Sequence, residues 1–154
     1  ELYKDNKNAY LVLVGTGEII DEIKNIVKKS AAKDRVIFTG LIDNVADYLS
    51  AFDVMLLPSL YEGLPMVVIE WQIAGLPCIV SDSVTKECAI TQLVKLKSLE
   101  EGPESWARDI ADIPLQDRAQ NKEMLINSIR KAGYDIELGA ERLRNIYISL
   151  META

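Results

Sequence analysis

Two carboxylates, Glu62 and Glu70, are the side chains of this sequence best placed to do chemistry. They lie on either side of Gly63 and Pro65, after the apolar run 53–57. Where a buried strand gives way to a helix through such a loop, unpaired backbone N–H groups are presented to anions. A carboxylate in the second turn of that helix can accept hydrogen bonds from a sugar diol. Together these features favour a nucleotide-sugar site.

The two acids also have a plainer interpretation, in which Glu62 is an exposed loop acid and Glu70 a solvated helix position. Against it, Glu70 lies between Ile69 and Trp71 in the otherwise apolar segment 66–74, where an acid without a partner is costly. The predicted helix also begins at the carboxyl end of a strand, where open α/β sheets bind ligands. We therefore expect a functional role for both acids.

A second candidate is Gly15-Thr16-Gly17, which follows an apolar run and precedes a helical pattern. The dinucleotide-binding pattern GxGxxG fails because Ile20 stands at its third glycine position. Two interpretations stay open: the glycines serve only a tight turn, or Gly15 and Gly17 line a ligand crevice.

Apolar runs alternate with helical patterns and would position both candidates. The runs predict strands at 9–15, 35–40, 53–57 and 78–81, with a weaker candidate at 90–96. Helical spacing predicts helices at 18–31, 45–52 and 66–74. The continuous run at 9–15 is typical of a strand buried on both faces. Strands and helices in this order predict parallel βαβ units and an α/β fold.

From Pro103 onwards the pattern is helical only, with amphipathic stretches that end at Pro114, Gly133 and Leu150. We expect this tail to pack on one face of the sheet. The length fits one domain. We predict a single domain over residues 1–154, with a core over about 9–100 and a helical tail over about 103–152.

Composition excludes several functions. The net charge of −7 argues against nucleic acid or an anionic membrane surface as a main partner. With no histidine, a Ser-His-Asp triad, a Cys-His pair and a histidine-based metal site are excluded. Cys78 and Cys88 have no metal-binding spacing and indicate reduced cytosolic thiols. No run is long enough to span a bilayer, so we predict a cytoplasmic protein.

The segment around the two acids resembles a known family. Seven residues separate Glu62 from Glu70, and matching segments lie at 13–18, 36–40, 56–63 and 74–82. These linked motifs resemble the retaining GT-B glycosyltransferases of the large bacterial family that uses nucleotide-diphosphate sugars, the glycosyl transferases group 1. The resemblance covers about residues 9–152 and implies the Rossmann-like, doubly wound C-terminal half of a GT-B fold.

The resemblance also implies a role for each matching residue. Glu70 would bind the ribose hydroxyls of the donor, and Glu62 would be the catalytic residue, beside the hydroxyls of the transferred sugar and near its anomeric carbon. Gly40 and Leu41 would lie beside the base. The sugar and diphosphate would be held by the segment Gly63, Leu64, Pro65, Met66 and Val67. No cofactor and no metal are expected, because helix dipoles and basic side chains would neutralise the leaving diphosphate.

The implied function is transfer of a sugar from a nucleotide-diphosphate donor to a glycan or lipid-linked acceptor, in capsule, exopolysaccharide or other cell-surface glycan synthesis. The alternatives are a non-catalytic GT-B partner subunit and a GT-B-shaped sugar-nucleotide epimerase. The opening residues 1–8 indicate an excised piece. Its partner would be the N-terminal acceptor domain of the same protein, and the isolated piece would be inactive. Homo-oligomers of the piece and attachment of the whole enzyme at the inner membrane are further expectations.

The sequence departs from the family in two ways that concern structure. We expect the family's first β-α unit, which would carry the phosphate-binding cations, to be missing from this piece. Its strand is central in the order 3-2-1-4-5-6, so we predict that strands 10–14 and 53–57 pair directly, or that two chains share an edge. Trp71-Gln72-Ile73 replaces small residues of the family, which we expect to alter only packing.

Overall fold

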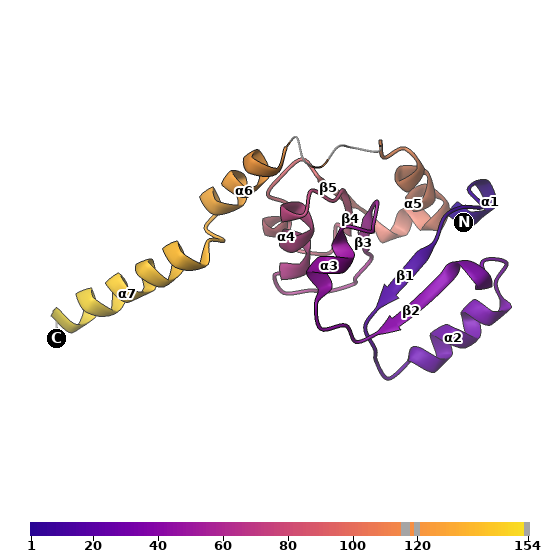
Figure 1. Cartoon of the computed structure of the whole chain (residues 1–154), viewed down its shortest axis with the longest axis horizontal. Coiled ribbons are helices and arrows are strands. Elements are labelled where there is room, and N and C mark those ends of the chain that lie inside the picture. Colours follow the sequence, from indigo (N-terminus) through magenta and orange to yellow (C-terminus); the bar gives the residue numbers. More distant parts are fainter. Residues whose placement is uncertain (115–117, 119–120, 153–154) are drawn as a thin grey trace. The chain divides into compact units, whose positions relative to one another are not determined.

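The computed structural model describes residues 1–114, 118 and 121–152, shown as a ribbon in Figure 1. The chain divides into two compact units. The first comprises residues 1–51 and 100–113, and the second comprises residues 52–99 and 114–154. Each unit is described by itself below.

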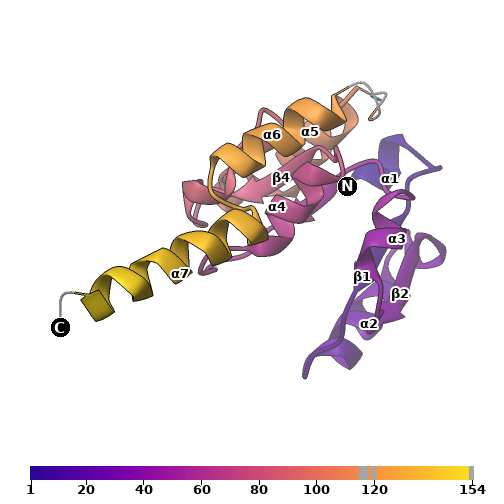
Figure 2. The same ribbon diagram turned by 60° about the vertical axis from the view of Figure 1, so that its left-hand side comes forward.

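The first unit is built on one parallel βαβ crossover. Strand β1 (Leu11–Val14) pairs in parallel with β2 (Val36–Gly40), and helix α2 (Ile20–Lys29) connects them. Helix α2 lies beside the strand pair in Figures 1 and 2, and none of its residues is buried. The prediction that the first strand is buried on both faces is wrong. A sheet of two strands with helix α2 beside it leaves Leu11 and Val14 of β1 exposed.

Three further helices complete the first unit. They are α1 (Leu2–Asp5), α3 (Val45–Leu49) and α5 (Gly102–Ala111). Helix α1 packs against α5, whose Trp106 is 9% exposed. A 3-10 turn, η1 (Lys33–Arg35), leads into β2.

The second unit holds most of the core, around the parallel sheet β3-β4-β5. Its strands are β3 (Met55–Leu57), β4 (Cys78–Ser81) and β5 (Val94–Lys97). Every residue of the middle strand β4 is buried, because it has a neighbour on each edge and is covered by helix α4 (Met66–Ile73). A 3-10 turn, η2 (Lys86–Cys88), lies between β4 and β5.

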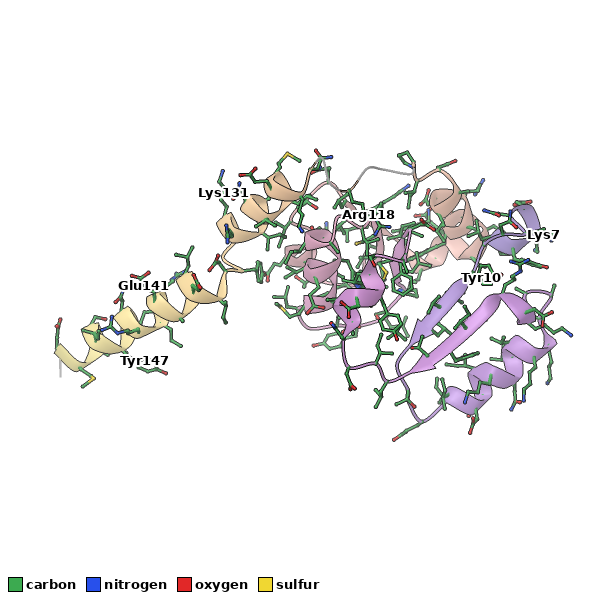
Figure 3. The ribbon with its side chains drawn as sticks, viewed as in Figure 1. Lys7, Tyr10, Arg118, Lys131, Glu141 and Tyr147 are labelled. Carbon is green, nitrogen blue, oxygen red and sulfur yellow. The ribbon has the colours of Figure 1, made fainter. Side chains whose placement is uncertain are left out.

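Helix α4 ends in a Schellman motif. The Leu76 N–H donates to the Trp71 carbonyl at 2.9 Å, and the Gly75 N–H to the Gln72 carbonyl at 3.0 Å. Gly75 has φ +73°, and an added Cβ would lie 3.2 Å from Cβ of Arg118. Arg118, labelled in Figure 3, donates in turn to the Phe52 carbonyl. Glycine is therefore required where α4 turns back into β4.

The last two helices differ in how they pack. Helix α6 (Lys122–Lys131) lies along α4, as Figure 2 shows, and buries Leu125 and Ile129. Helix α7 (Ile136–Glu152) has no buried residue. The expectation that the whole tail packs on the sheet is thus wrong for α7, whose apolar side chains remain exposed, and α5 belongs to the first unit.

The sheet order tests the prediction that strands 10–14 and 53–57, now β1 and β3, pair directly. The described strands form two sheets, β1-β2 and β3-β4-β5, so direct pairing of β1 with β3 is wrong. The two strands belong to different units, and each takes its hydrogen bonds from the strand that follows it in the chain. Sharing of an edge between two chains stays a prediction.

None of the described helices is both long enough and apolar enough to cross a bilayer.

Candidate functional site

Glu62 lies in the loop that joins β3 to α4 and is held there by a serine. The Ser59 hydroxyl donates to Glu62 Oε1 at 2.8 Å. Both residues are half-buried, whereas Leu60 and Tyr61 between them are 83% and 85% exposed. The hydrogen bond therefore fixes the orientation of the Glu62 carboxylate, although the loop around it is exposed. Ser59 was not singled out by the sequence, although its spacing of three residues from Glu62 is a common one for such local contacts.

Glu70 lies on the exposed side of α4. Its neighbours on that side are Met66, Val67 and Ile73, which are all exposed as well. The premise that Glu70 must be costly in an apolar helix is therefore wrong, because the carboxylate is in solvent. The helix instead presents an apolar face with a single acid, and no side-chain hydrogen bond to Glu70 is found in the part of the chain that the structure describes.

The N-terminus of α4 keeps its first backbone donors available. Pro65 is the N-cap residue, and no side chain of the described residues caps the helix. The first N–H of the helix with a main-chain acceptor is that of Val68, which donates to the Pro65 carbonyl at 3.0 Å. The amides of Met66 and Val67 precede it, so they are the donors that the helix dipole offers to an anion.

Gln72 is the polar side chain that α4 buries, with no exposed surface. Its Nε2 donates to the carbonyls of Val68 at 3.0 Å and Cys88 at 2.8 Å. Its Oε1 accepts from the N–H of Ile90 at 3.1 Å and from the N–H and hydroxyl of Thr91 at 2.8 and 3.0 Å. The expectation that this residue alters only packing is wrong, since it bonds α4 to the segment after β4. A polar residue in an apolar helix is a signal that fits Gln72 as well as Glu70, and burial makes Gln72 the one that needs hydrogen-bond partners.

In the first unit, the structure brings the predicted Gly15 and Gly40 together at the ends of their strands. The Gly15 N–H donates to the Gly40 carbonyl at 2.9 Å, and the two residues have φ of +119° and +67°. These positive values require glycine, because other residues are strained there. Leu41 is 80% exposed, and Gly17 is exposed with open space around it. The turn interpretation thus accounts for Gly15, and a crevice lined by Gly15 and Gly17 stays a prediction.

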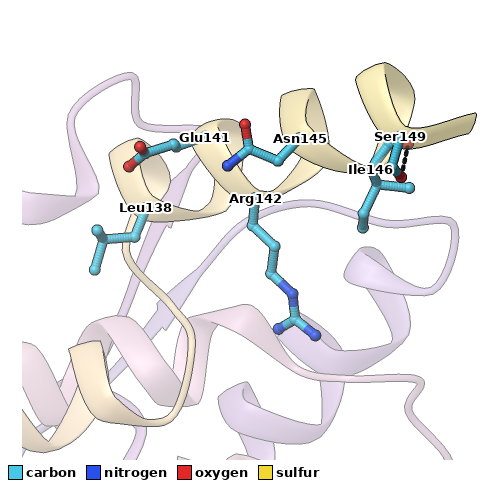
Figure 4. Close-up of a pocket in the computed structure, with 6 residues that line it drawn as sticks. All are labelled: Leu138, Glu141, Arg142, Asn145, Ile146 and Ser149. Carbon is cyan, nitrogen blue, oxygen red and sulfur yellow. Dashed lines mark hydrogen bonds between the residues drawn. The ribbon is translucent and has the colours of Figure 1, made fainter. Parts of the chain in front are cut away.

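Within the described residues, the remaining chemistry-bearing groups do not form a second site. Burial raises the pKa of Cys78 to about 12, and burial also raises the pKa of Cys88, so both thiols are protonated at neutral pH. The described residues contain no group of three or more cysteine or acidic side chains that could hold a metal. A shallow hollow on α7 is lined by side chains of that one helix, which Figure 4 shows spread along its surface. A hollow formed by a single exposed helix has no opposite wall to enclose a ligand.

Comparisons with known proteins place the chain in a family. A family model described as Glycosyl transferases group 1 matches residues 1–113. EpsF of Bacillus subtilis (strain 168), a protein named as a glycosyltransferase, is 37% identical over 138 residues, which cover 89% of this chain and 36% of EpsF. An Escherichia coli protein named UDP-Gal:alpha-D-GlcNAc-diphosphoundecaprenol alpha-1,3-galactosyltransferase is 28% identical over 151 residues, covering 94% of this chain and 38% of its own length.

Solved structures agree on the fold. The sucrose-phosphate synthase from Thermosynechococcus elongatus superposes with a TM-score of 0.73 at 26% identity, over 94% of this chain and 39% of the synthase. TarM gives the same TM-score of 0.73 at 17% identity, over 95% of this chain and 30% of TarM. The chain thus spans between a third and two fifths of the length of EpsF and the galactosyltransferase. By the match of its sequence and of its Rossmann-like α/β fold, the chain belongs to the glycosyl transferases group 1 family.

Proposed function

We propose that this chain is the donor-binding half of a retaining glycosyltransferase, which transfers a sugar from a nucleotide-diphosphate donor. The observation that carries the proposal is the placement of Glu70 as the one acid on the exposed apolar face of α4. That helix leaves the carboxyl end of β3, which is where open parallel sheets bind ligands. The family match makes a nucleotide sugar the ligand that this arrangement fits best.

Glu70 is proposed to bind the ribose. A carboxylate has two oxygens and can accept one hydrogen bond from each hydroxyl of a vicinal diol. Such charge-assisted bonds are stronger than bonds between neutral groups. The apolar side chains of Met66 and Val67 beside Glu70 would exclude water from the bonded diol, which strengthens the bonds further.

Glu62 is proposed to act at the transferred sugar. Ser59 occupies one lone pair of its Oε1, which leaves Oε2 to accept a sugar hydroxyl. The segment from Gly63 to Val67 lies between the two acids and would hold the sugar and the diphosphate through its main-chain N–H groups. The amides of Met66 and Val67 at the start of α4 are the donors suited to the phosphate charge.

The remaining parts of the proposal concern the base and the acceptor. Gly40 and Leu41, with Gly15 and Gly17 nearby in the same unit, would lie on the side of the base. Helix dipoles and basic side chains would neutralise the diphosphate without a metal. Relatives are named for O-antigen and Vi polysaccharide biosynthesis, which supports a cell-surface glycan or a lipid-linked precursor as the acceptor.

Titration calorimetry of the protein at its natural length tests the donor assignment. The wild type, Glu70→Ala and the control Glu123→Ala, which removes an exposed acid from α6, are titrated with UDP, GDP and ADP and their sugar derivatives. Hydrogen bonds to a charged group contribute about 1.5–3 kcal/mol each. Loss of the ribose bonds should therefore weaken binding roughly tenfold or more, with the control unchanged. Equal affinity in wild type and Glu70→Ala would refute the ribose assignment.

A further inference from the structure

The side-chain amide of Gln72 has every hydrogen-bonding position filled. Its two N–H groups donate to two carbonyls, and its oxygen accepts three bonds from Ile90 and Thr91. These partners also fix which end of the amide is which, because the carbonyls can only accept and the backbone amides can only donate. A buried group with this many partners fixes the elements it joins in one relative arrangement.

Gln72 joins the last turn of α4 to the residues that lead into β5. Helix α4 follows β3, and the segment 82–91 follows β4, the middle strand. Ligands of open parallel sheets bind at the opposite, carboxyl edge, where α4 begins. The amide therefore anchors the far end of the helix that carries Glu70, close to where β4 and β5 begin.

Directional bonds are needed here because the rest of the helix packing is apolar. Val68, Ile69 and Trp71 anchor α4 by hydrophobic contact, which is non-directional and permits small rotations of the helix about its axis. Residues two apart on a helix differ by about 200°, so Gln72 holds the side of α4 opposite to Glu70. A rotation of about 10° would move an atom 5–6 Å from the axis by roughly 1 Å, and misplacement of that size can cost up to about a hundredfold in rate.

We propose that Gln72 is a positioning residue of the donor site, whose amide locks α4 to the segment 82–91 and thereby sets the direction in which Glu70 meets the ribose. This inference rests on the proposed function. It adds that affinity for the nucleoside diphosphate depends on a residue that does not touch it. The effect of Gln72 must then pass through Glu70.

A double-mutant cycle in the protein at its natural length tests this dependence. Gln72→Met keeps the length of the side chain and removes its hydrogen bonds, and Glu70→Ala removes the acid. Dissociation constants are measured by calorimetry for wild type, both single variants and the double variant, with whichever of UDP, GDP or ADP the wild type binds. The control is Gln92→Met, which changes an exposed glutamine next to Thr91.

If Gln72 acts through Glu70, Gln72→Met should weaken binding about tenfold in the wild-type background and less than about twofold in Glu70→Ala. Gln92→Met should have no effect in either background. A merely structural role would give the same factor in both backgrounds, and that result, or no effect at all, would overturn the inference. The proposed function fails separately, if wild type binds no nucleotide or if Glu70→Ala binds as wild type does; either result also removes the basis of the inference.

A milder variant covers the case in which Gln72→Met does not fold. Thr91→Val removes one hydroxyl bond to the amide oxygen from the other side of the contact. It should weaken nucleotide binding by a smaller factor, roughly two- to fivefold, and this factor should again disappear in Glu70→Ala. A factor that persists in Glu70→Ala, or unchanged affinity in the wild-type background, would overturn the inference.

Discussion

Replacing Gln72 by methionine should destabilise the second unit by about 2–4 kcal/mol, because the substitution leaves buried polar groups without partners. The Cys88 carbonyl is in a residue with no exposed surface and loses its 2.8 Å bond outright. A buried group left in this way costs about 1–3 kcal/mol. Ile90 and Thr91 are half-buried, so water can reach their N–H groups in part, and we expect both together to add about 1 kcal/mol.

Urea unfolding followed by tryptophan fluorescence measures this loss. Trp71 adjoins Gln72 and is buried in the second unit, whereas Trp106 belongs to the first unit, so Trp106→Phe makes Trp71 the single reporter. With a slope of about 2 kcal/mol per molar urea, the midpoint should fall by about 1–2 M. The exposed control Gln92→Met should stay within about 0.5 kcal/mol of its parent. A loss no larger than that for Gln72→Met would refute the reasoning about the amide.

Three other outcomes follow from the geometry. Ser59→Ala should lower kcat more than donor affinity, because it releases Glu62 without touching the ribose site; steady-state kinetics with unchanged kcat would contradict this. Cys78 and Cys88 should resist a thiol reagent at about pH 8 in the native protein and react on unfolding, because raised pKa values keep them as thiols; rapid native labelling would argue against their burial. Asp135→Asn should reduce the helicity of α7 near neutral pH, because hydrogen bonds from the main chain of that helix lower the pKa of Asp135. The difference in helicity from wild type should shrink as the pH falls through that lowered pKa. Circular dichroism that shows an equal difference in acid would contradict this prediction.

Most secondary structure could be predicted because strands and helices here follow simple periodicities. The apolar run 78–81 is strand β4, and the helix predicted at 66–74 is α4. The strand predicted at 90–96 begins only at Val94. Gln72 explains the difference: Ile90 and Thr91 both donate their N–H groups to one oxygen, whereas successive N–H groups of a strand point in opposite directions. A contact over 18 residues of sequence cannot be read from local pattern.

The sequence predicted which elements carry the two candidate acids but not how buried those acids are. The place of Glu62 and Glu70 between an apolar run and a helical pattern made them candidates, and their roles stay a prediction. Which side of α4 faces the core depends on where β4 and α6 pack, and the helix is apolar almost all round, so periodicity gave no direction. The structure buries Gln72 and exposes Glu70. The sequence argument instead expected the free-energy cost of a polar group in an apolar helix to fall on Glu70. An exposed acid is the arrangement that a ligand arriving from solvent requires.

The central claim, that Glu70 binds the ribose diol, is tested most directly by comparing nucleotides with and without that diol. The protein at its natural length and its Glu70→Ala variant are each titrated with the preferred nucleoside diphosphate and with its 2′,3′-dideoxy analogue. The wild type should bind the ribose form at least about tenfold more tightly, since each hydrogen bond to a charged group contributes about 1.5–3 kcal/mol. Glu70→Ala should bind both forms with equal affinity. Discrimination that persists undiminished in Glu70→Ala would contradict the account.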